Sequence, residues 1–499
     1  MNKETKRQIG IVCSLFMYFL YVILLMMRTK VLIVSYGSEV NAVFQSSNQI
    51  FLYFILFESG MSAAYQFKLY GSVACKDAKR IASLFMGLKE SMKVVALKMS
   101  VALLGVSVIY PFFMDKVSIS LAKSGVMLFL LGIRFVIPYF VSIASKTLLN
   151  VYDYKYVVDN IDSFGYIIIT IMEILAVVLF QWSVYSVLMI GCIGNLIIGS
   201  IYFFIVKIFC KEIQAEEIVP DFEPDEMTKD IFFHQITGLF NSNIDTIILS
   251  VVNIMLVTPY HAYYSTMNYF PQVINKISEN YRTKVGMKIK RNDPDLYNYF
   301  QLMTGFHMCA AIIAVSLFVL NINSFIRLWI GKEYILSNSC IILLALYLML
   351  KMTTNSLFLV RDGAGLYRES KWFSFWEGIT NLGLSIILVH NWGIEGILFA
   401  TVLSTYTMLI PGNAKLVFKD VMKRKNTIWA DYLIIMITSV LLIIGNRGII
   451  GKMECASWKV FFIRLIGQTC VCVVVGALVA LAVKWKYISH YIFKRLQQN

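Results

Sequence analysis

A few ionisable side chains of this chain lie inside long apolar stretches, where a charge is costly. They are Arg28, Glu58, Arg134, Glu173, Asp245, Glu377 and Arg464. On insertion scales, a charge at the middle of a bilayer costs about 2.5–3.5 kcal/mol, so such residues face a wet cavity or a partner. Guanidinium groups suit phosphate, and buried carboxylates suit protons or cations. Anion binding and ion exchange are therefore the two chemistries that these positions predict.

Each position also has a structural interpretation. Arg28 lies near one end of its apolar stretch and could extend to the interface, whereas Arg134 lies near the middle of its stretch, four residues before Pro138. Glu58 could pair with an arginine on a neighbouring helix as readily as it could exchange ions. Asp245 follows Asn241 and Asn243 in a polar stripe and is the best single candidate for a functional acid. Arg464 is interpreted as interfacial.

The elements that must position these groups are membrane-spanning helices. The chain has 499 residues, of which 58% are hydrophobic and only 15% charged, with a mean hydropathy of +0.69; a soluble domain has about 25% charged residues. Segments of about 20 apolar residues can cross a bilayer. Fourteen are predicted, at 10–34, 41–66, 92–113, 124–145, 157–181, 183–206, 231–252, 259–280, 299–321, 336–358, 372–391, 393–414, 429–446 and 460–484.

Lysine and arginine alternate between the loops that join these segments. Every second loop is rich in them, as in the run of six from Lys68 to Lys93, while the intervening loops hold only seven of the 45. Basic loops stay on the cytoplasmic side of a membrane. This pattern predicts a multi-pass protein of the cytoplasmic membrane with both termini in the cytoplasm. It also explains the net charge of +15 through topology and anionic lipids, without a nucleic-acid partner.

The loop pattern also predicts the domain organisation. Residues 211–229 contain two prolines and a dense run of acids, which is typical of a linker. Six basic residues follow the second span and six more, Lys276 to Arg291, follow the eighth. We therefore expect an N-lobe of six spans at 1–210, a cytoplasmic linker at 211–229, a C-lobe of six spans at 230–415, and two additional spans at 416–499. Two lobes of like orientation are typical of parallel repeats in transporters.

Motifs for covalent chemistry and for metals are missing from the sequence. It contains no phosphate-binding glycine-rich loop, no HExxH and no nucleophile triad. Its nine cysteines have no metal or disulfide spacing. The histidines are scattered, at His234, His261, His307, His390 and His490. We expect neither an enzyme nor a cofactor, and transport would depend on H⁺ or Na⁺ coupling or on substrate flux.

Four segments resemble bacterial polysaccharide flippases, the O-antigen, capsule and teichoic-acid type of lipid-linked oligosaccharide flippase. This family is a branch of the multidrug/oligosaccharidyl-lipid/polysaccharide exporter superfamily. The segments are Ser35–Tyr70, Phe233–Ser250 with Asp245, FIRLWIGKEY at 325–334, and Arg361–Tyr406 with GLYRESKW and GIEGILFATVLSTY. Their order extends from the first span to the twelfth. The resemblance implies an all-α fold similar to multidrug and toxin extrusion (MATE) transporters, with two six-helix lobes around a central cavity and two extra C-terminal helices.

The resemblance also implies the substrate, which is an undecaprenyl-pyrophosphate-linked oligosaccharide moved to the outer leaflet for surface polysaccharide synthesis. In that setting Arg28, Arg134 and Arg361 would bind the pyrophosphate and acidic sugars. Glu58, Asp245, Glu173 and Glu377 would be cavity or ion-coupling acids. The expected partners are the lipid-linked oligosaccharide, membrane lipids, and a polymerase and other polysaccharide assembly proteins.

Other functions remain open at this stage. A multidrug exporter of the same fold would favour an acid-rich, arginine-poor cavity for cationic drugs. A membrane-embedded polysaccharide polymerase or ligase would need a sizeable outer loop for its catalytic residues, whereas the longest outer connections, near 322–335 and 447–459, are short. A receptor or scaffold would leave the buried charges unexplained.

Overall fold

The structure is a computed structural model that describes residues 3–58, 60–114, 119–209, 219–222, 244–449 and 457–496. Throughout these ranges the regular structure is helical and no strand is present. Helices satisfy their own backbone hydrogen bonds, which the bilayer core requires because it offers no water. The predicted all-α fold is confirmed.

Eleven helices in the described ranges are long and apolar enough to cross a membrane, or twelve if one bent pair counts as a single span. One of them, 368–421, is long enough to contain two predicted spans, and another, 244–278, contains most of one predicted span and the end of the span before it. Residues 368–421 contain Gly393, whose φ of 56° interrupts the helix, and residues 244–278 contain a 3₁₀ turn at Ile254–Leu256. The protein is therefore a multi-pass membrane protein. Part of the predicted seventh span, 231–243, lies outside the described residues.

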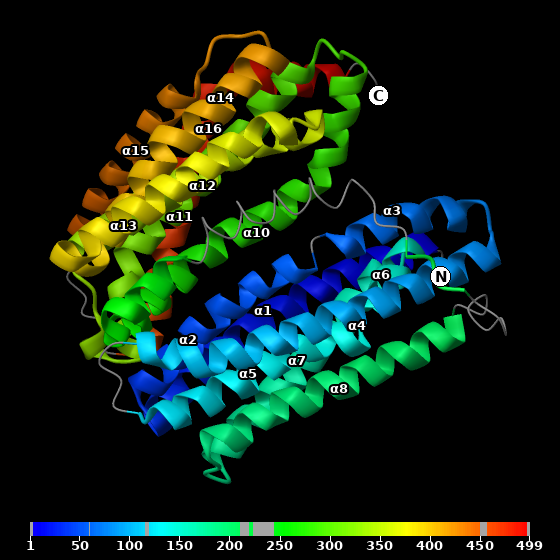
Figure 1. Cartoon of the computed structure of the whole chain (residues 1–499). Coiled ribbons are helices and arrows are strands. Elements are labelled where there is room, and N and C mark those ends of the chain that lie inside the picture. The colour runs from blue at the N-terminus through cyan, green and yellow to red at the C-terminus, as the bar shows by residue number, and fades with distance from the viewer. Residues whose placement is uncertain are drawn as a thin grey trace. The chain divides into compact units, whose positions relative to one another are not determined.

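The helices form two compact units, which we call the N-terminal unit (1–239 with 250–258) and the C-terminal unit (240–249 with 259–499). Among its described residues, the N-terminal unit has eight α-helices (Figure 1): α1 (Lys3–Tyr36), α2 (Ser38–Leu52), α3 (Met61–Ala74), α4 (Ala78–Ile109), α5 (Leu121–Val141), α6 (Ile143–Val151), α7 (Lys155–Val178) and α8 (Val184–Phe209). Within it, α1 packs along α7, and α5 packs against both α4 and α8. These contacts bring charged residues of α1, α5 and α7 together.

Two interruptions shape the N-terminal unit. Gly60 has a left-handed backbone, with a φ of 72°, and a bend of 47° separates Ser38–Phe57 from Met61–Val73. Pro138 lies inside α5, and Ser142 has a non-helical backbone between α5 and α6. Proline cannot donate a backbone hydrogen bond and crowds the preceding turn. Pro138 therefore leaves the backbone oxygen of Arg134, one turn earlier, without its helical donor. The break at Ser142 is separate, since the Ser142 N–H still donates to the backbone oxygen of Pro138 at 2.8 Å.

In the part of the C-terminal unit that the structure describes, residues 244–249 are joined by seven α-helices: α10 (Val257–Lys290, within the unit from Pro259), α11 (Leu296–Trp329), α12 (Asn338–Ala364), α13 (Tyr367–Ser404), α14 (Ile410–Lys415), α15 (Ile428–Ile449) and α16 (Trp458–Leu496). π-helical turns at Thr405–Leu409 and Leu416–Val421 flank α14. The helix α11 packs against α12, α15 and α16, so it is the centre of this unit.

The last two helices are attached to α11 by buried polar contacts as well as by apolar packing. Lys484 of α16 donates to both carboxylate oxygens of Asp431 on α15, at 2.8 and 3.0 Å, and to Gln301 Oε1 on α11 at 2.7 Å. Nearer the start of α16, Arg464 Nη2 donates to the backbone oxygen of Leu320 at 2.8 Å. The predicted two-span segment 416–499 is thus an integral part of the C-terminal unit.

Most of the predicted linker 211–229 lies outside the described residues, but residues 219–222 pack on the N-terminal unit. The carboxylate of Asp221 pairs with Arg80 of α4 at 2.9 Å. The backbone oxygen of Asp221 accepts from the Tyr65 hydroxyl of α3 at 2.7 Å. Ser83 Oγ donates to the backbone oxygen of Val219 at 2.6 Å. This short segment therefore docks on α3 and α4.

Candidate functional site

Two arginines and one glutamate meet inside the N-terminal unit, and we call Arg28, Arg134 and Glu173 the charged triad. Arg28 Nε lies 2.6 Å from Glu173 Oε2, and Arg134 Nη1 lies 2.7 Å from Glu173 Oε1. The Glu173 side chain is 1% exposed, against 8% for Arg28 and 19% for Arg134. One carboxylate therefore binds both guanidinium groups, each through a different oxygen.

The packing of α1, α5, α7 and α8 positions the triad. The contact of α1 with α7 places Arg28 opposite Glu173. On α8, Asn195 donates to the backbone oxygen of Arg134 at 2.7 Å. A Cβ at Gly191 would lie 2.8 Å from the Arg134 guanidinium group, so a residue without a side chain is needed there. The arginine of α5 thereby fits between α7 and α8.

The triad carries a net charge of +1, because one carboxylate offsets only one of its two guanidinium groups. The guanidinium of Arg28 also lies over the ring of Phe44, 4.4 Å from its centroid, a favourable cation–π arrangement. Its Nη2 atom is buried and has no hydrogen-bond partner among the described residues. A buried donor without a partner costs about 1–3 kcal/mol. The triad is therefore suited to donate a hydrogen bond to an anionic ligand from this free donor position.

A second polar cluster surrounds Asp245 in the C-terminal unit. Asp245 Oδ2 accepts from the Tyr260 hydroxyl at 2.9 Å and from the Thr401 hydroxyl at 3.1 Å. Thr401 Oγ1 also lies 3.3 Å from Asn381 Oδ1, to which Ser385 donates at 3.1 Å. We call Asp245, Tyr260, Asn381, Ser385 and Thr401 the Asp245 cluster. Asn241 and Asn243, which extend the predicted polar stripe, lie outside the described residues.

The Asp245 cluster presents oxygen atoms around one unsatisfied carboxylate oxygen. Asp245 Oδ1 is buried and has no hydrogen-bond partner in the described structure, and the whole residue is 7% exposed. Hydroxyl, amide and carboxylate oxygens are ligands for hard cations, whereas thiolate and imidazole suit softer metals. The arrangement can therefore bind a proton or a hard monovalent cation at Asp245.

Stacked aromatic rings extend from the Asp245 cluster to a buried lysine. Tyr260 stacks on Tyr264 with centroids 5.3 Å apart, and Tyr264 stacks on Tyr347 at 6.4 Å. The ammonium of Lys351 lies 5.5 Å from the Tyr347 ring and donates to Asn268 Oδ1 at 2.7 Å. Lys351 is absent from the predicted site residues. The sequence does contain a signal for it, because Lys351 is a charged residue inside the predicted span 336–358, as Arg134 is inside the predicted span 124–145.

The remaining predicted residues lie outside these two clusters. Glu377 is buried and accepts from the Thr405 hydroxyl at 2.8 Å. Arg361 binds Asp362 Oδ1 through Nη2 at 2.8 Å and is 9% exposed. Glu58 Oε1 accepts from the backbone N–H of Ser62 at 3.0 Å and so caps the start of α3. The structure therefore joins Arg28 and Arg134 through Glu173, and gives Arg361, Glu58 and Glu377 local partners.

Comparison with known proteins finds this architecture in solved structures. No protein-family model matches the chain, and no curated protein matches it. Among solved structures, it is similar to the lipid II flippase MurJ in an inward closed conformation, with a TM-score of 0.72, 17% identity, and coverage of 96% of this chain and 100% of that one. The chain has the fold of a lipid flippase structure. At these identities the likeness establishes the fold alone.

MATE transporters share the same fold over less of the chain. An inward-facing multidrug resistance transporter of the MATE family, described as a member of the MOP superfamily, matches with a TM-score of 0.58 and 10% identity over 81% of this chain and 95% of that one. A MATE transporter in a bent conformation matches with a TM-score of 0.55 and 14% identity over 83% and 94%. The predicted MATE-like fold is confirmed.

Proposed function

We propose that this protein moves an undecaprenyl-pyrophosphate-linked oligosaccharide from the cytoplasmic to the outer leaflet of the bacterial cytoplasmic membrane. It would do so by alternating access, for surface polysaccharide synthesis. The observation that carries the proposal is the charged triad, a buried group of net charge +1 with an unused guanidinium donor. The match over 96% of the chain to a lipid II flippase supports it.

The triad assigns different tasks to its three residues. Arg28 and Arg134 would donate charge-assisted hydrogen bonds to the pyrophosphate, because guanidinium groups match phosphate oxygens in geometry and charge. Glu173 would act as a positioning residue, since it binds both arginines and lowers the cost of burying them. The polyprenyl tail would stay in the bilayer while the polar head group passes through the protein.

A cation at Asp245 would reset the transport cycle. The carboxylate already accepts from two hydroxyl groups, and its second oxygen has no partner among the described residues. Binding of H⁺ or Na⁺ there would remove the cost of a buried, partly unsatisfied negative charge. The two conformations of the protein would then differ in their affinity for the cation, which is the condition for coupling.

The alternative function is a multidrug exporter, which the similarity to MATE transporters favours. The net charge of the charged triad distinguishes the two functions. A net positive, buried group attracts a pyrophosphate and repels a cationic drug. The MATE matches also cover 81–86% of the chain against 96% for the lipid II flippase, so the larger likeness is to the flippase.

The test is a leaflet-transfer assay in proteoliposomes that contain an undecaprenyl-pyrophosphate oligosaccharide with a labelled sugar. Wild-type protein should move the sugar to the opposite leaflet, and the double variant R28Q/R134Q should not. Arg464→Gln is the matched control, because Arg464 also donates from within a span but to a backbone oxygen of α11. Equal transfer by R28Q/R134Q and the wild type would refute the proposal. Transfer of cationic dyes alone would establish the exporter instead.

A further inference from the structure

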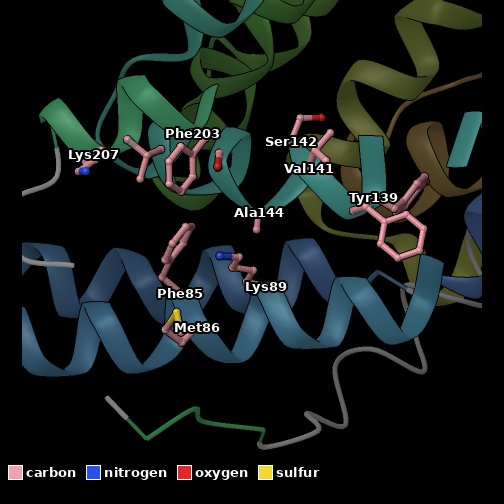
Figure 2. A pocket seen from close by; sticks show the side chains of 12 residues that line it. Phe85, Met86, Lys89, Tyr139, Val141, Ser142, Ala144, Phe203 and Lys207 are labelled. Atoms are coloured by element: carbon pink, nitrogen blue, oxygen red, sulfur yellow. The ribbon is translucent and has the colours of Figure 1, made fainter. Parts of the chain in front are cut away.

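A cavity of about 220 Å³ lies within the N-terminal unit, away from the charged triad. Its walls come from α4, from the junction of α5 and α6, and from the last two turns of α8. Figure 2 shows Phe85 of α4 and Phe203 of α8 directed toward one another across it, and beside them Lys89 of α4 facing Ala144 of α6. The cavity is therefore mainly apolar, with lysine at its edge.

A second, apolar groove continues from this cavity along α4 and α5. It has a volume of about 230 Å³ and is lined by residues that include Leu104, Phe129 and Ile137. Phe140 lines both spaces, so they are neighbours along the same pair of helices. From Lys89 to Leu104 the helix α4 rises about 22 Å at about 1.5 Å per residue.

That length matches one leaflet of a bilayer. Half of the hydrocarbon core is about 15 Å thick, and the interfacial region adds about 5–7 Å on each side. Lys89 precedes the predicted span 92–113, and Lys207 follows the predicted span 183–206. Both lysines therefore lie at the level of the basic, cytoplasmic loops. The groove extends from them toward the middle of the membrane.

The groove opens on a lipid-facing surface. Phe203 is 54% exposed and Leu104 is 56% exposed. Along α4, the exposed residues Leu97, Val101, Leu104 and Val108 follow one another at helical spacing. In a chain that spans a membrane, such an apolar stripe contacts acyl chains.

The lysine at the cavity has no acidic partner of its own. No carboxylate in the described part of the chain lies within ion-pair distance of Lys89, and its neighbour Glu90 is bound to Lys93 at 2.6 Å. Lys207, at the end of α8, is exposed. The cavity edge therefore carries positive charge where lipid phosphates lie, and basic pockets between helices on this side bind anionic head groups.

We propose that this cavity and groove form a binding site for an anionic phospholipid of the cytoplasmic leaflet. The head-group phosphate binds Lys89 and Lys207, the glycerol region lies beside Phe85 and Phe203, and one acyl chain follows the groove past Phe140. The site is separate from the transport substrate, whose polar head group must cross the membrane. A groove one leaflet long fits a phospholipid chain and is too short for a polyprenyl chain of eleven isoprene units.

The bound lipid would stabilise the break between α5 and α6. Ser142, the residue at the break, lines the cavity together with Tyr139 and Ser145. A ligand that binds this geometry and no other stabilises the folded state by an amount that rises with the logarithm of the ligand concentration. Anionic lipid should therefore raise the thermal stability of the protein, and zwitterionic lipid with the same acyl chains should not.

The experiment measures lipid binding to the purified full-length protein by native mass spectrometry and by thermal shift. Phosphatidylglycerol and phosphatidylcholine with identical acyl chains are the probes, with undecaprenyl phosphate as the competitor. Each lysine near an anionic surface contributes about fivefold, so K89Q/K207Q should bind phosphatidylglycerol about 25-fold more weakly than the wild type. The control K415Q/K419Q removes two exposed lysines at the end of another span and should bind normally.

A second variant tests the groove independently of charge. Ile133→Trp fills the space between α4 and α5 and should weaken the binding of phosphatidylglycerol while the lysines remain. Equal affinity of phosphatidylglycerol for the wild type and K89Q/K207Q would overturn the proposal. Displacement of phosphatidylglycerol by an equimolar amount of undecaprenyl phosphate would also overturn it, because the site would then belong to the transport substrate.

Discussion

Arg28 of α1 and Glu173 of α7 form an ion pair with 2.6 Å between Nε and Oε2, and both side chains are almost completely buried. Glu173 also binds Arg134 through its other oxygen. Since neither arginine has another carboxylate partner among the described residues, each depends on Glu173 for its neutralisation. The three residues should therefore respond to substitution as one unit.

Glu173→Gln should destabilise the protein by about 3–5 kcal/mol, because it leaves two buried guanidinium groups without a counter-charge. The double variant E173Q/R134Q should be more stable than E173Q alone, since it removes one of these charges. Unfolding in detergent, followed as a double-mutant cycle, measures the coupling. Additive effects of the two substitutions would show that the triad does not act as a unit.

Asp245→Asn should abolish any dependence of stability and transport on Na⁺ or H⁺ without preventing folding. The amide oxygen can still accept from Tyr260 and Thr401, whose hydroxyls donate to Asp245 Oδ2 in the wild type. Thermal unfolding in NaCl and in choline chloride tests Na⁺, since a bound ion raises stability with concentration; a pH gradient in the transport assay tests H⁺. Unchanged ion dependence in Asp245→Asn would place the coupling site elsewhere.

Glu58→Gln should retain transport, because the structure gives this acid a capping role. An amide oxygen can still accept from the backbone N–H of Ser62, as Glu58 Oε1 does at 3.0 Å. Glu58→Ala should cost about 1 kcal/mol of stability, since a donor at the start of α3 loses its partner. Unfolding and transport assays on both variants distinguish a capping role of Glu58 from a role in ion coupling. Loss of transport in Glu58→Gln at normal stability would make Glu58 an ion-coupling residue.

The order and class of the elements could be read from the sequence because the bilayer imposes strong constraints. A helix must be about 20 apolar residues long, and its flanking charges must be sorted by side. These constraints act over short distances along the chain, so the apolar runs and the charges beside them are enough to predict the helices. Breaks within helices are harder to predict, because the sequence does not distinguish Gly60 and Gly393 from glycines that remain helical. Both nevertheless have a positive φ in the structure.

The partners of the buried charges could not be read from the sequence. Arg134 and Glu173 are both predicted as intramembrane charges, yet the link between them depends on how α7 and α5 each pack against α8 and how α1 packs against α7. Lys351, Asp431 and Lys484 meet the same criterion, since each lies within or at the edge of a predicted span, and they are missing from the predicted set. Which charged side chains meet depends on how each helix is rotated about its own axis, and that rotation is fixed by the packing of all its neighbours.

Gly87→Ala should displace residues 219–222 from the N-terminal unit. A Cβ at position 87 would lie 2.0 Å from the backbone oxygen of Asp221, so the segment that binds Arg80 and Tyr65 must shift. Gly105→Ala is the control on the same helix, because nothing lies within 4 Å of its added Cβ. Gly105→Ala should increase stability by up to about 1 kcal/mol. Limited proteolysis should cut Gly87→Ala faster than Gly105→Ala; equal rates would show that the segment is not held by α4.

Lys484→Met and Asp431→Leu should each destabilise the protein by about 3–5 kcal/mol when made alone, because each leaves a buried charge without its partner. Both side chains are 4% exposed, and Lys484 binds both oxygens of Asp431. The double variant should recover most of the loss, since two apolar side chains pack without any buried charge. Retained leaflet transfer in the double variant would show that the pair serves only to hold α15 and α16 on α11. Full stability with lost transfer would instead give the pair a role in transport, and would contradict the structural assignment.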